Sequence, residues 1–305
     1  MVTAPIDQSH RLDPGAIVVG VDGSEAGDLA LRWAAETASA RGRRLRIVRA
    51  LDLAAARAVF GSYDLLIPSV TGELREQGAH DIARARRLAQ HIDPTLRIDS
   101  EISDRGAAAV LIDESETAHL TVIGAAGSGT TLGHLGSTLL AVTAHAHGSV
   151  VVVRDTGTEQ QTRRDGPVVV GIDGSGFGRA ALEAAFGEAG ERHAQLIAVH
   201  CWTDLRFERL TGLPDTITDR DVAEAAQDFL TEQLTEWTQK YPEVPVLRKV
   251  YLSGPRHHLL EWSKSAQLVV TGSRGRGGFR GLLLGSTSNA LVQRAHCPIM
   301  VVHPS

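Results

Sequence analysis

The sequence predicts an α/β protein built from two tandem, doubly wound domains, each with a five-stranded parallel sheet. Three observations lead to this prediction: apolar runs of strand length, segments of helical spacing between them, and a repeat of the whole pattern half a chain later. Continuous apolar strands that alternate with helices are typical of a parallel sheet covered on both faces. Such sheets bind their ligands at the carboxyl ends of the strands.

The elements of the first copy follow one another in a regular order. Residues 17–21 are an apolar run, and residues 25–41 have helical spacing, with Leu29 and Trp33 one turn apart. By the same criteria we expect further strands at residues 45–48, 96–102, 120–123 and 150–153, and further helices at 74–92, 107–115 and 139–146. Residues 51–72 and 202–219, which follow the second strand of each copy, differ between the copies and are expected to be loops.

The repeat defines the domain boundaries. Segments of the first half recur in the second with an offset of 148 to 151 residues. The pairs are residues 20–24 (GVDGS) with 171–175 (GIDGS), 118–124 (AHLTVIG) with 266–272 (AQLVVTG), and 150–153 (VVVV) with 299–302 (IMVV). A nearly constant offset indicates two homologous domains and not a solenoid. We expect a tail over residues 1–14, domains over 15–154 and 167–305, and a polar linker over 155–166.

Composition narrows the functional classes. A formal net charge of −5 and an aromatic content of 4% give no reason to expect a nucleic-acid partner. No apolar run approaches the length of a membrane helix, and the charged N-terminus does not resemble a signal peptide. The two cysteines cannot form a disulfide framework, which is typical of a protein in a reducing compartment. Taken together, these features predict a cytoplasmic protein without a membrane partner.

The most informative motif is the glycine-rich turn after the apolar run 268–271. Its spacing is Gly, two residues, Gly, nine residues, Gly-Ser, carried by Gly272, Gly275, Gly285 and Ser286. Glycines at a strand-to-helix turn let backbone N–H groups approach an anion, and a helix N-terminus favours negative charge. The turn therefore predicts a phosphate cradle. The arginines Arg274, Arg276 and Arg280 would neutralise a polyphosphate, although three solvated arginines are the alternative.

Asp173 follows the first strand of the second copy. A carboxylate at that position can accept hydrogen bonds from the two hydroxyls of a ribose, whereas the alternative role is a cap for the following helix. Taken alone, an Asp-Gly-Ser segment favours the cap. Its occurrence in the same unit as the glycine-rich turn favours the ribose, and the two together predict a mononucleotide site.

The first copy departs from this pattern. Gly124 and Gly127 keep the opening of the turn, but eight residues, not nine, separate Gly127 from Gly136 and Ser137. This stretch contains no arginine or lysine. We therefore expect the first site to bind a nucleotide more weakly, or to need Mg²⁺ or a neighbouring domain for compensation.

At these residues the chain resembles the tandem-domain form of the universal stress protein family. The resemblance covers about residues 15–154 and 167–305, and Gly272, Gly275, Gly285 and Ser286 match the family's nucleotide-binding motif in full. It implies that Asp22 and Asp173 contact ribose. It further implies that Gly20 and Gly171 line the adenine, with main-chain contacts near Ala50 and Cys201.

The resemblance also implies a fold and a role. The fold is that of the adenine nucleotide alpha hydrolase-like proteins, with sheet order 3-2-1-4-5. The cofactor that the resemblance implies is ATP, with Mg²⁺. Dimerisation of single-domain members through their last strands would be mimicked inside a tandem chain, as an internal pseudo-dimer with residues 150–153 near 299–302, and two chains would form a homodimer. The expected role is in stress response or growth control, through a regulatory protein partner that the sequence does not identify.

Binding and catalysis remain alternatives. The leading hypothesis is a nucleotide-dependent regulator without dedicated catalysis. The competing hypothesis is a slow ATP hydrolase or phosphotransferase, and a third is a scaffold with vestigial sites. A Walker-A loop needs Gly-Lys-Ser/Thr, which does not occur, and Asp22 and Asp173 would lie at the ribose end of the ligand. His134 is the remaining candidate base in the turns. We expect no catalytic residue and no metal ligand among the side chains.

Overall fold

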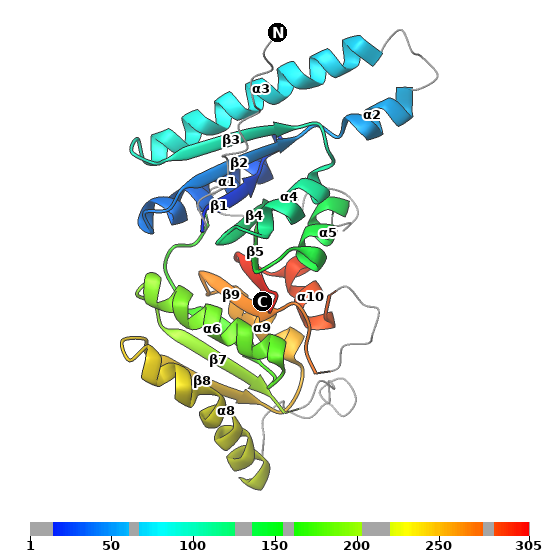
Figure 1. The fold of residues 1–305 in the computed structure, drawn as a ribbon. Helices are drawn as coiled ribbons and strands as arrows, with labels where there is room; N and C mark the ends of the chain where they lie inside the picture. Colours follow the sequence, from blue (N-terminus) through cyan, green and yellow to red (C-terminus); the bar gives the residue numbers. More distant parts are fainter. Residues whose placement is uncertain are drawn as a thin grey trace, which may run out of the picture.

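A computed structural model of the chain describes residues 15–60, 67–125, 136–154, 162–202, 220–276 and 284–304 (Figure 1). The first half contains β1 (Ile17–Gly20), α1 (Glu25–Ala40), β2 (Leu45–Ala50), α2 (Leu53–Phe60), α3 (Ile67–Ile92), β3 (Ile98–Ser103), α4 (Ala107–Ser115), β4 (Leu120–Gly124), α5 (Ser137–His145) and β5 (Ser149–Val153). The second half contains β6 (Val168–Ile172), α6 (Gly176–Glu191), β7 (Leu196–Cys201), α8 (Arg220–Lys240), β8 (Val246–Tyr251), α9 (Pro255–Ser263), β9 (Leu268–Gly272), α10 (Ser286–Arg294) and β10 (Ile299–Val302). The predicted alternation of strands and helices is therefore present in both halves.

The strands of the two halves form one sheet. Its order is β3-β2-β1-β4-β5-β10-β9-β6-β7-β8, so each half has the order 3-2-1-4-5 that the family resemblance implied. Neighbouring strands within each half are parallel. The halves meet where β5 pairs with β10 in antiparallel register, with Ile299 opposite Val152 and Val302 opposite Ser149. The sheet consequently runs through the whole molecule (Figure 1).

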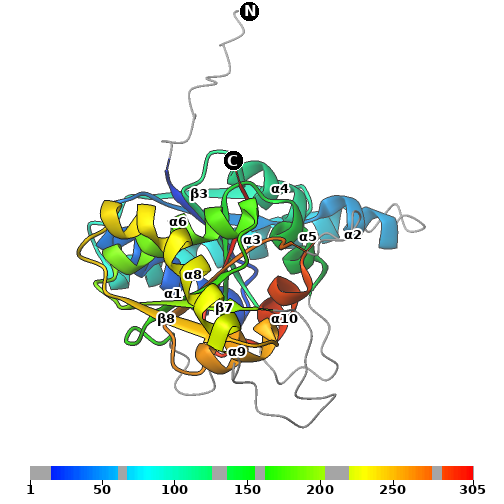
Figure 2. The same cartoon turned by 90° about the horizontal axis from the view of Figure 1, so that it is seen from below.

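Helices cover both faces of the sheet, as expected for apolar strands without a polar side (Figure 2). Alternate residues of β1 show this arrangement: Ile17 and Val19 belong to the buried cluster on the face that α1, α3, α6 and α8 cover, whereas Val18 belongs to the cluster on the face of α4, α5, α9 and α10. Burial of each large aliphatic side chain contributes roughly 1.5–3 kcal/mol. Among helices in the described residues, none combines the length and apolarity needed to cross a membrane.

The loop predicted over residues 51–72 was wrong in part. The eight residues of α2 lie there, and α3 begins at Ile67 instead of residue 74. The residues of α2 are mostly alanine, leucine and other helix formers, so their local propensity favours a helix even without a clear apolar face in the sequence. The second predicted loop covers residues 202–219, of which 203–219 lie outside the described ranges. The tail over residues 1–14 and residues 155–161 of the linker also lie outside them.

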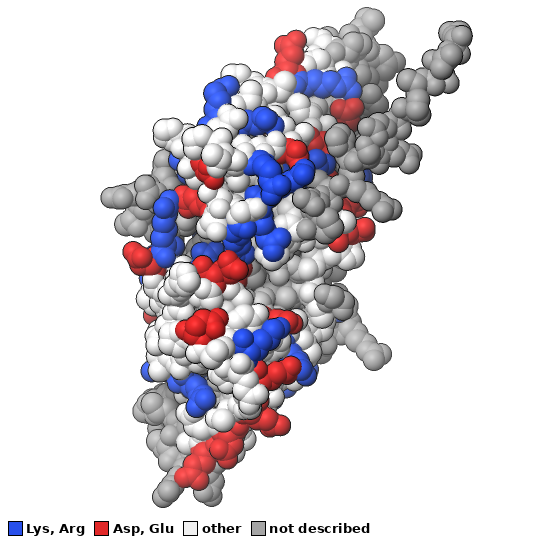
Figure 3. All heavy atoms as spheres, turned by 60° about the vertical axis from the view of Figure 1, so that its left-hand side comes forward, with Lys and Arg blue, Asp and Glu red and all other residues white. Residues whose placement is uncertain are grey.

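Charged side chains of both signs are interspersed on the face shown in Figure 3. Exposed charges of the described chain also form pairs, such as Arg179 with Glu236 at 2.6 Å and Lys240 with Glu183 at 3.3 Å. Pairs of this kind contribute at most about 1 kcal/mol each. The mixed surface provides no broad basic field for a polyanion on that face.

A buried charge cluster lies between the two halves, where α1 and α6 end. Glu188 accepts a hydrogen bond from Arg41 of the first half (2.8 Å) and another from Arg192 of its own half (3.0 Å). The guanidinium of Arg192 also lies over the ring of Trp33, 5.3 Å from its centre. Arg41 and Arg192 occupy equivalent positions of the repeat, but the position equivalent to Glu188 is Thr37. One carboxylate therefore compensates both arginines.

Two equivalent residues, one from each half, reach across to the last helix of the other half. Arg154, after β5, donates to the main-chain oxygen of Val292 in α10. His303, after β10, interacts through Nε2 with the oxygen of Thr143 in α5 at 3.0 Å. These reciprocal contacts, together with the β5–β10 pairing, fix the two halves against each other.

The histidines at this boundary make stability sensitive to pH. Burial lowers the pKa of His119 below its ordinary value of 6.5, and the charges of Arg43 and Arg41 lower it further. Burial also lowers the pKa of His303. Because the unfolded chain then binds more protons than the native one below about pH 6.5, stability falls as the pH falls.

We expect the free energy of unfolding, measured with urea, to decrease from about pH 7.5 to about pH 5.5. The variant His119→Gln should show a shallower decrease, since Gln267 occupies the equivalent position in the second half and does not titrate. An identical pH dependence in the variant would show that His119 does not contribute.

Candidate functional site

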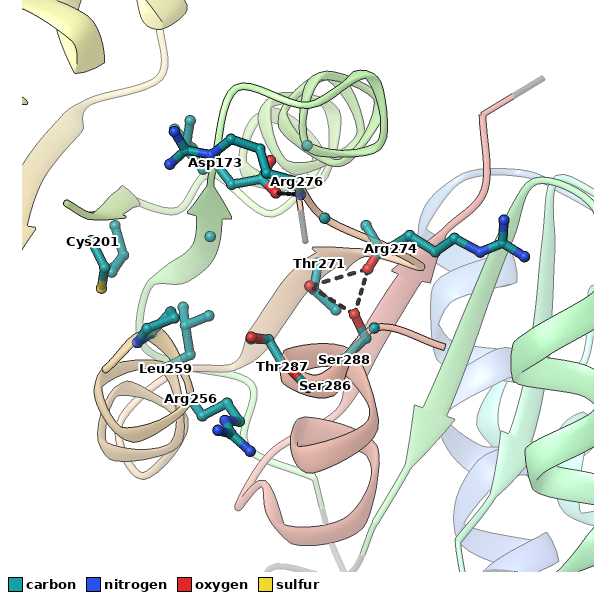
Figure 4. A pocket seen from close by; sticks show the side chains of 18 of the residues that line it. Asp173, Cys201, Arg256, Leu259, Thr271, Arg274, Arg276, Ser286, Thr287 and Ser288 are labelled. Atoms are coloured by element: carbon teal, nitrogen blue, oxygen red, sulfur yellow. Dashed lines mark hydrogen bonds between the residues drawn. The ribbon is translucent and has the colours of Figure 1, made fainter. Parts of the chain in front are cut away.

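A pocket of about 330 Å³ opens at the carboxyl ends of β6, β7 and β9, between α9 and α10 (Figure 4). Every described site residue that the sequence predicted for the second half lines it: Gly171, Asp173, Cys201, Gly272, Arg274, Gly275, Arg276, Gly285 and Ser286. Residues far apart in the chain thus meet in one cavity of the size that small-molecule sites have.

Asp173 joins the end of β6 to the glycine-rich turn. Its Oδ1 accepts hydrogen bonds from the main-chain nitrogen of Ser175 (2.9 Å) and from the hydroxyl of Ser175 (2.7 Å). Its Oδ2 accepts one from the main-chain nitrogen of Arg276 (2.9 Å). The cap of α6 itself is Ser175, whose Oγ accepts from Gly178 at 3.0 Å. Asp173 therefore supports the cap indirectly and positions the turn directly.

The glycines of the turn are required by close contacts. A Cβ on Gly275 would lie 2.6 Å from Oδ2 of Asp173, and one on Gly272 would lie 2.7 Å from the main-chain oxygen of Phe177. Both distances are shorter than a carbon atom tolerates. The turn is also held by Gly285, whose main-chain nitrogen donates to the oxygen of Ser273 at 2.8 Å. The first turn of α10, beginning at Ser286, lines the pocket (Figure 4). The N–H groups in the first turn of a helix have no partner within the helix.

Two buried hydroxyls that the sequence interpretation missed hold α10 against β9. Ser288 donates from its Oγ to the main-chain oxygen of Gly272 at 2.6 Å, and its Oγ lies 3.5 Å from that of Thr271. In the first half the equivalent positions are Leu139 and Ile123, which are apolar. A comparison of the two copies could have identified Ser288 and Thr271, because polar residues there replace apolar ones of the first half.

The arginines of the turn do not point at α10. The guanidinium of Arg274 lies over the ring of Phe177, 5.9 Å from its centre, and that of Arg276 lies over Phe229 at 6.0 Å. In Figure 4 both side chains extend away from Ser286 and Thr287. Arg280 lies outside the described residues. A different arginine, Arg256 of α9, lines the pocket and extends from α9 towards α10, and the sequence interpretation did not identify it.

The candidate residues of the first half are arranged similarly at the start of the helix. Asp22 accepts from the main-chain nitrogen of Ser24 at 3.0 Å, and Ser24 caps α1 by accepting from Gly27 at 3.1 Å. Gly20, Ala50 and Gly124 end β1, β2 and β4. In the second half Cys201 and Gly272 end β7 and β9, and Gly171 is the last residue but one of β6. Gly136 and Ser137 begin α5. Gly127 and His134 lie outside the described residues.

The end of β2 differs from the end of β7 in its polar contacts. Arg49 donates from Nη1 to the main-chain oxygen of Ala50 (2.6 Å) and from Nε to Asp81 (2.9 Å). In the second half, His200 occupies the position of Arg49, and its ring packs on that of Phe229 with centroids 4.6 Å apart. The carbonyl group that an adenine would use in the first half therefore already accepts a hydrogen bond.

Acidic groups are scarce around the pocket. Asp173 is the one carboxylate among the described lining residues. Within the described ranges, no group of three or more His, Cys, Asp or Glu side chains is placed to hold a metal ion. The site as a whole presents cations and N–H groups to a ligand, which suits an anion.

Comparison with known proteins gave three results. The model of the universal stress protein family matches residues 15–154 and again 166–303. A universal stress protein of Mycobacterium tuberculosis is 36% identical over 298 residues, covering 95% of this chain and 96% of that protein. One of Mycolicibacterium smegmatis is 38% identical over 295 residues, covering 94% and 97%. The crystal structure of a universal stress protein from Archaeoglobus fulgidus aligns with a TM-score of 0.70 at 17% identity, covering 96% of this chain and all of that one, which shows the shared fold.

Proposed function

Since the chain belongs to the universal stress protein family, we propose that its second domain binds ATP and that nucleotide occupancy regulates a stress response or growth control, without dedicated catalysis. The observation that carries this proposal is the pocket. It brings the predicted ribose acceptor Asp173 together with the glycine-rich turn and the N-terminus of α10. A nucleotide would place its sugar at Asp173 and its phosphates against the turn and Ser286.

The residues present fit this ligand. Gly272 and Gly275 have no Cβ, and the close contacts around them exclude one. The backbone of the turn is therefore free of side chains where phosphate oxygens would approach. The N-terminal end of α10 supplies N–H groups and a favourable dipole. Mg²⁺ would arrive with the phosphates, because it is held mainly by phosphate oxygens and water in such sites.

The pocket supports binding more than catalysis. Phosphoryl transfer needs a carboxylate for the metal and a group that positions the nucleophile near the γ-phosphate. Asp173 is the one carboxylate among the described lining residues, and both of its oxygens accept hydrogen bonds from the protein. We further propose that two chains form a homodimer and that a regulatory protein partner reads the state of the nucleotide site.

The proposal is tested by counting bound nucleotide. The purified protein is denatured, the released nucleotide is identified by mass, and its amount per chain is measured. We expect ATP, and a large decrease in its amount in the variant Gly275→Val, whose side chain would collide with Asp173.

The variant Gly187→Ala is the control, since Gly187 lies in α6 and an added Cβ there meets nothing within 4 Å. It should retain the amount of nucleotide found in the unaltered chain. Equal amounts of ATP in the Gly275→Val and Gly187→Ala proteins would contradict the assignment of the site.

A further inference from the structure

Arg256 is a third arginine that borders the pocket. It is the second residue of α9, directly after Pro255, and it lines the nucleotide pocket. Within the described part of the chain it forms neither an ion pair nor a hydrogen bond, whereas Arg41, Arg46 and Arg49 each pair with a carboxylate. It is exposed and extends from α9 towards the first turn of α10 (Figure 4).

The electrostatics around Arg256 favour an anion. A cation in the first turn of a helix is disfavoured by about 0.3–1 kcal/mol, and Arg256 occupies that turn of α9. The N-terminus of α10 also faces the pocket, so two positive helix ends and a guanidinium converge there. Asp173, the carboxylate among the described lining residues, lies on the other side of the pocket from Arg256 (Figure 4).

The other two cations that line the described pocket are held elsewhere. Arg274 and Arg276 pack on Phe177 and Phe229, contacts that contribute about 0.5–1 kcal/mol each at exposed sites. Arg256 is thus the guanidinium, among the described lining residues, that extends towards α10. In the first half, Ala108 occupies the equivalent position and supplies no charge.

We infer that Arg256 binds the terminal phosphates of the nucleotide and makes the second-domain site selective for nucleoside di- and triphosphates over monophosphates. The inference rests on the proposed function and adds a residue outside the glycine-rich motif. In this inference the ribose lies at Asp173, the first phosphate lies at the turn, and the distal phosphates lie beside the first turn of α10, towards which Arg256 extends (Figure 4). A guanidinium binds such phosphates through two parallel hydrogen bonds, which makes the contact both strong and directional.

The test compares ATP, ADP and AMP binding to the nucleotide-free, full-length chain by calorimetry. For Arg256→Ala we expect a roughly 10-fold or larger increase in the Kd for ATP and at most a ~2-fold change for AMP. Arg256→Lys should recover part of the ATP affinity, because it restores a charge without the planar fork. The control Arg248→Ala removes the same charge from an exposed position on β8 and should leave every Kd unchanged.

Each other outcome has a definite meaning. Equal weakening of ATP and AMP in Arg256→Ala would place Arg256 at the base or ribose and overturn the inference. An unchanged Kd for ATP would overturn it as well, since Arg256 would then be solvated. Failure of the unaltered chain to bind ATP at all would overturn the proposed function itself. This result differs from a failure of the Arg256 inference, because it is observed without any variant.

Discussion

Replacing Asp173 with alanine is expected to reduce ATP affinity ~100-fold or more, the largest effect of any single change at the site. The variant would lose the proposed ribose acceptor. It would also lose the bond from Oδ2 to the main-chain nitrogen of Arg276, which fixes the glycine-rich turn, and the two bonds to Ser175. Calorimetric titration of ATP into the nucleotide-free protein measures the effect.

The first half supplies a matched control in Asp22→Ala. Asp22 supports the cap of α1 through Ser24, just as Asp173 supports the cap of α6, so both variants lose similar helix-start stability of about 1 kcal/mol. If ATP binds mainly to the second domain, Asp22→Ala should retain nearly full affinity. Equal losses in the two variants would contradict that distinction.

The sequence was sufficient to predict the alternation of elements because apolar runs of strand length are buried from both faces, as in β1 and β6. The order of the strands came from the family resemblance, because periodicity alone does not say which strands are neighbours. The continuous sheet through β5 and β10 depends on two segments 149 residues apart in the chain. The helix α2 was missed because its alanines carry no apolar periodicity.

The sequence predicted those site residues whose positions depend on local spacing in the chain. It did not predict those whose positions depend on how distant elements pack together. Gly272, Gly275 and Asp173 were identified because a close backbone approach and a strand end leave a signature in the sequence. Arg256 was not, since its place at the pocket depends on how α9 packs beside α10. The direction of Arg276 likewise depends on Phe229, a residue of α8 that is distant in sequence.

Replacing Glu188 with glutamine is expected to lower the free energy of unfolding by about 3–5 kcal/mol, the largest stability effect that the fold predicts. Glutamine keeps the size of the side chain but removes its charge. The side chains of Arg41 and Glu188 are only 8% and 6% exposed, so two arginines would remain close together with little access to water. A loss of this size is a large part of the 5–15 kcal/mol that typically stabilises a domain. Urea unfolding at neutral pH measures it.

Glu183→Gln is the control, because Glu183 is 55% exposed and pairs with Lys240 at 3.3 Å on the surface of the same half. Its effect should stay within about 1 kcal/mol. The double variant Arg41→Gln with Glu188→Gln should recover part of the loss, since it removes one of the two uncompensated charges. Similar destabilisation by Glu183→Gln and Glu188→Gln would mean that the boundary does not depend on this carboxylate. The expected difference follows from the asymmetry of the repeat: Thr37 cannot replace Glu188, so one side chain compensates the arginines of both domains.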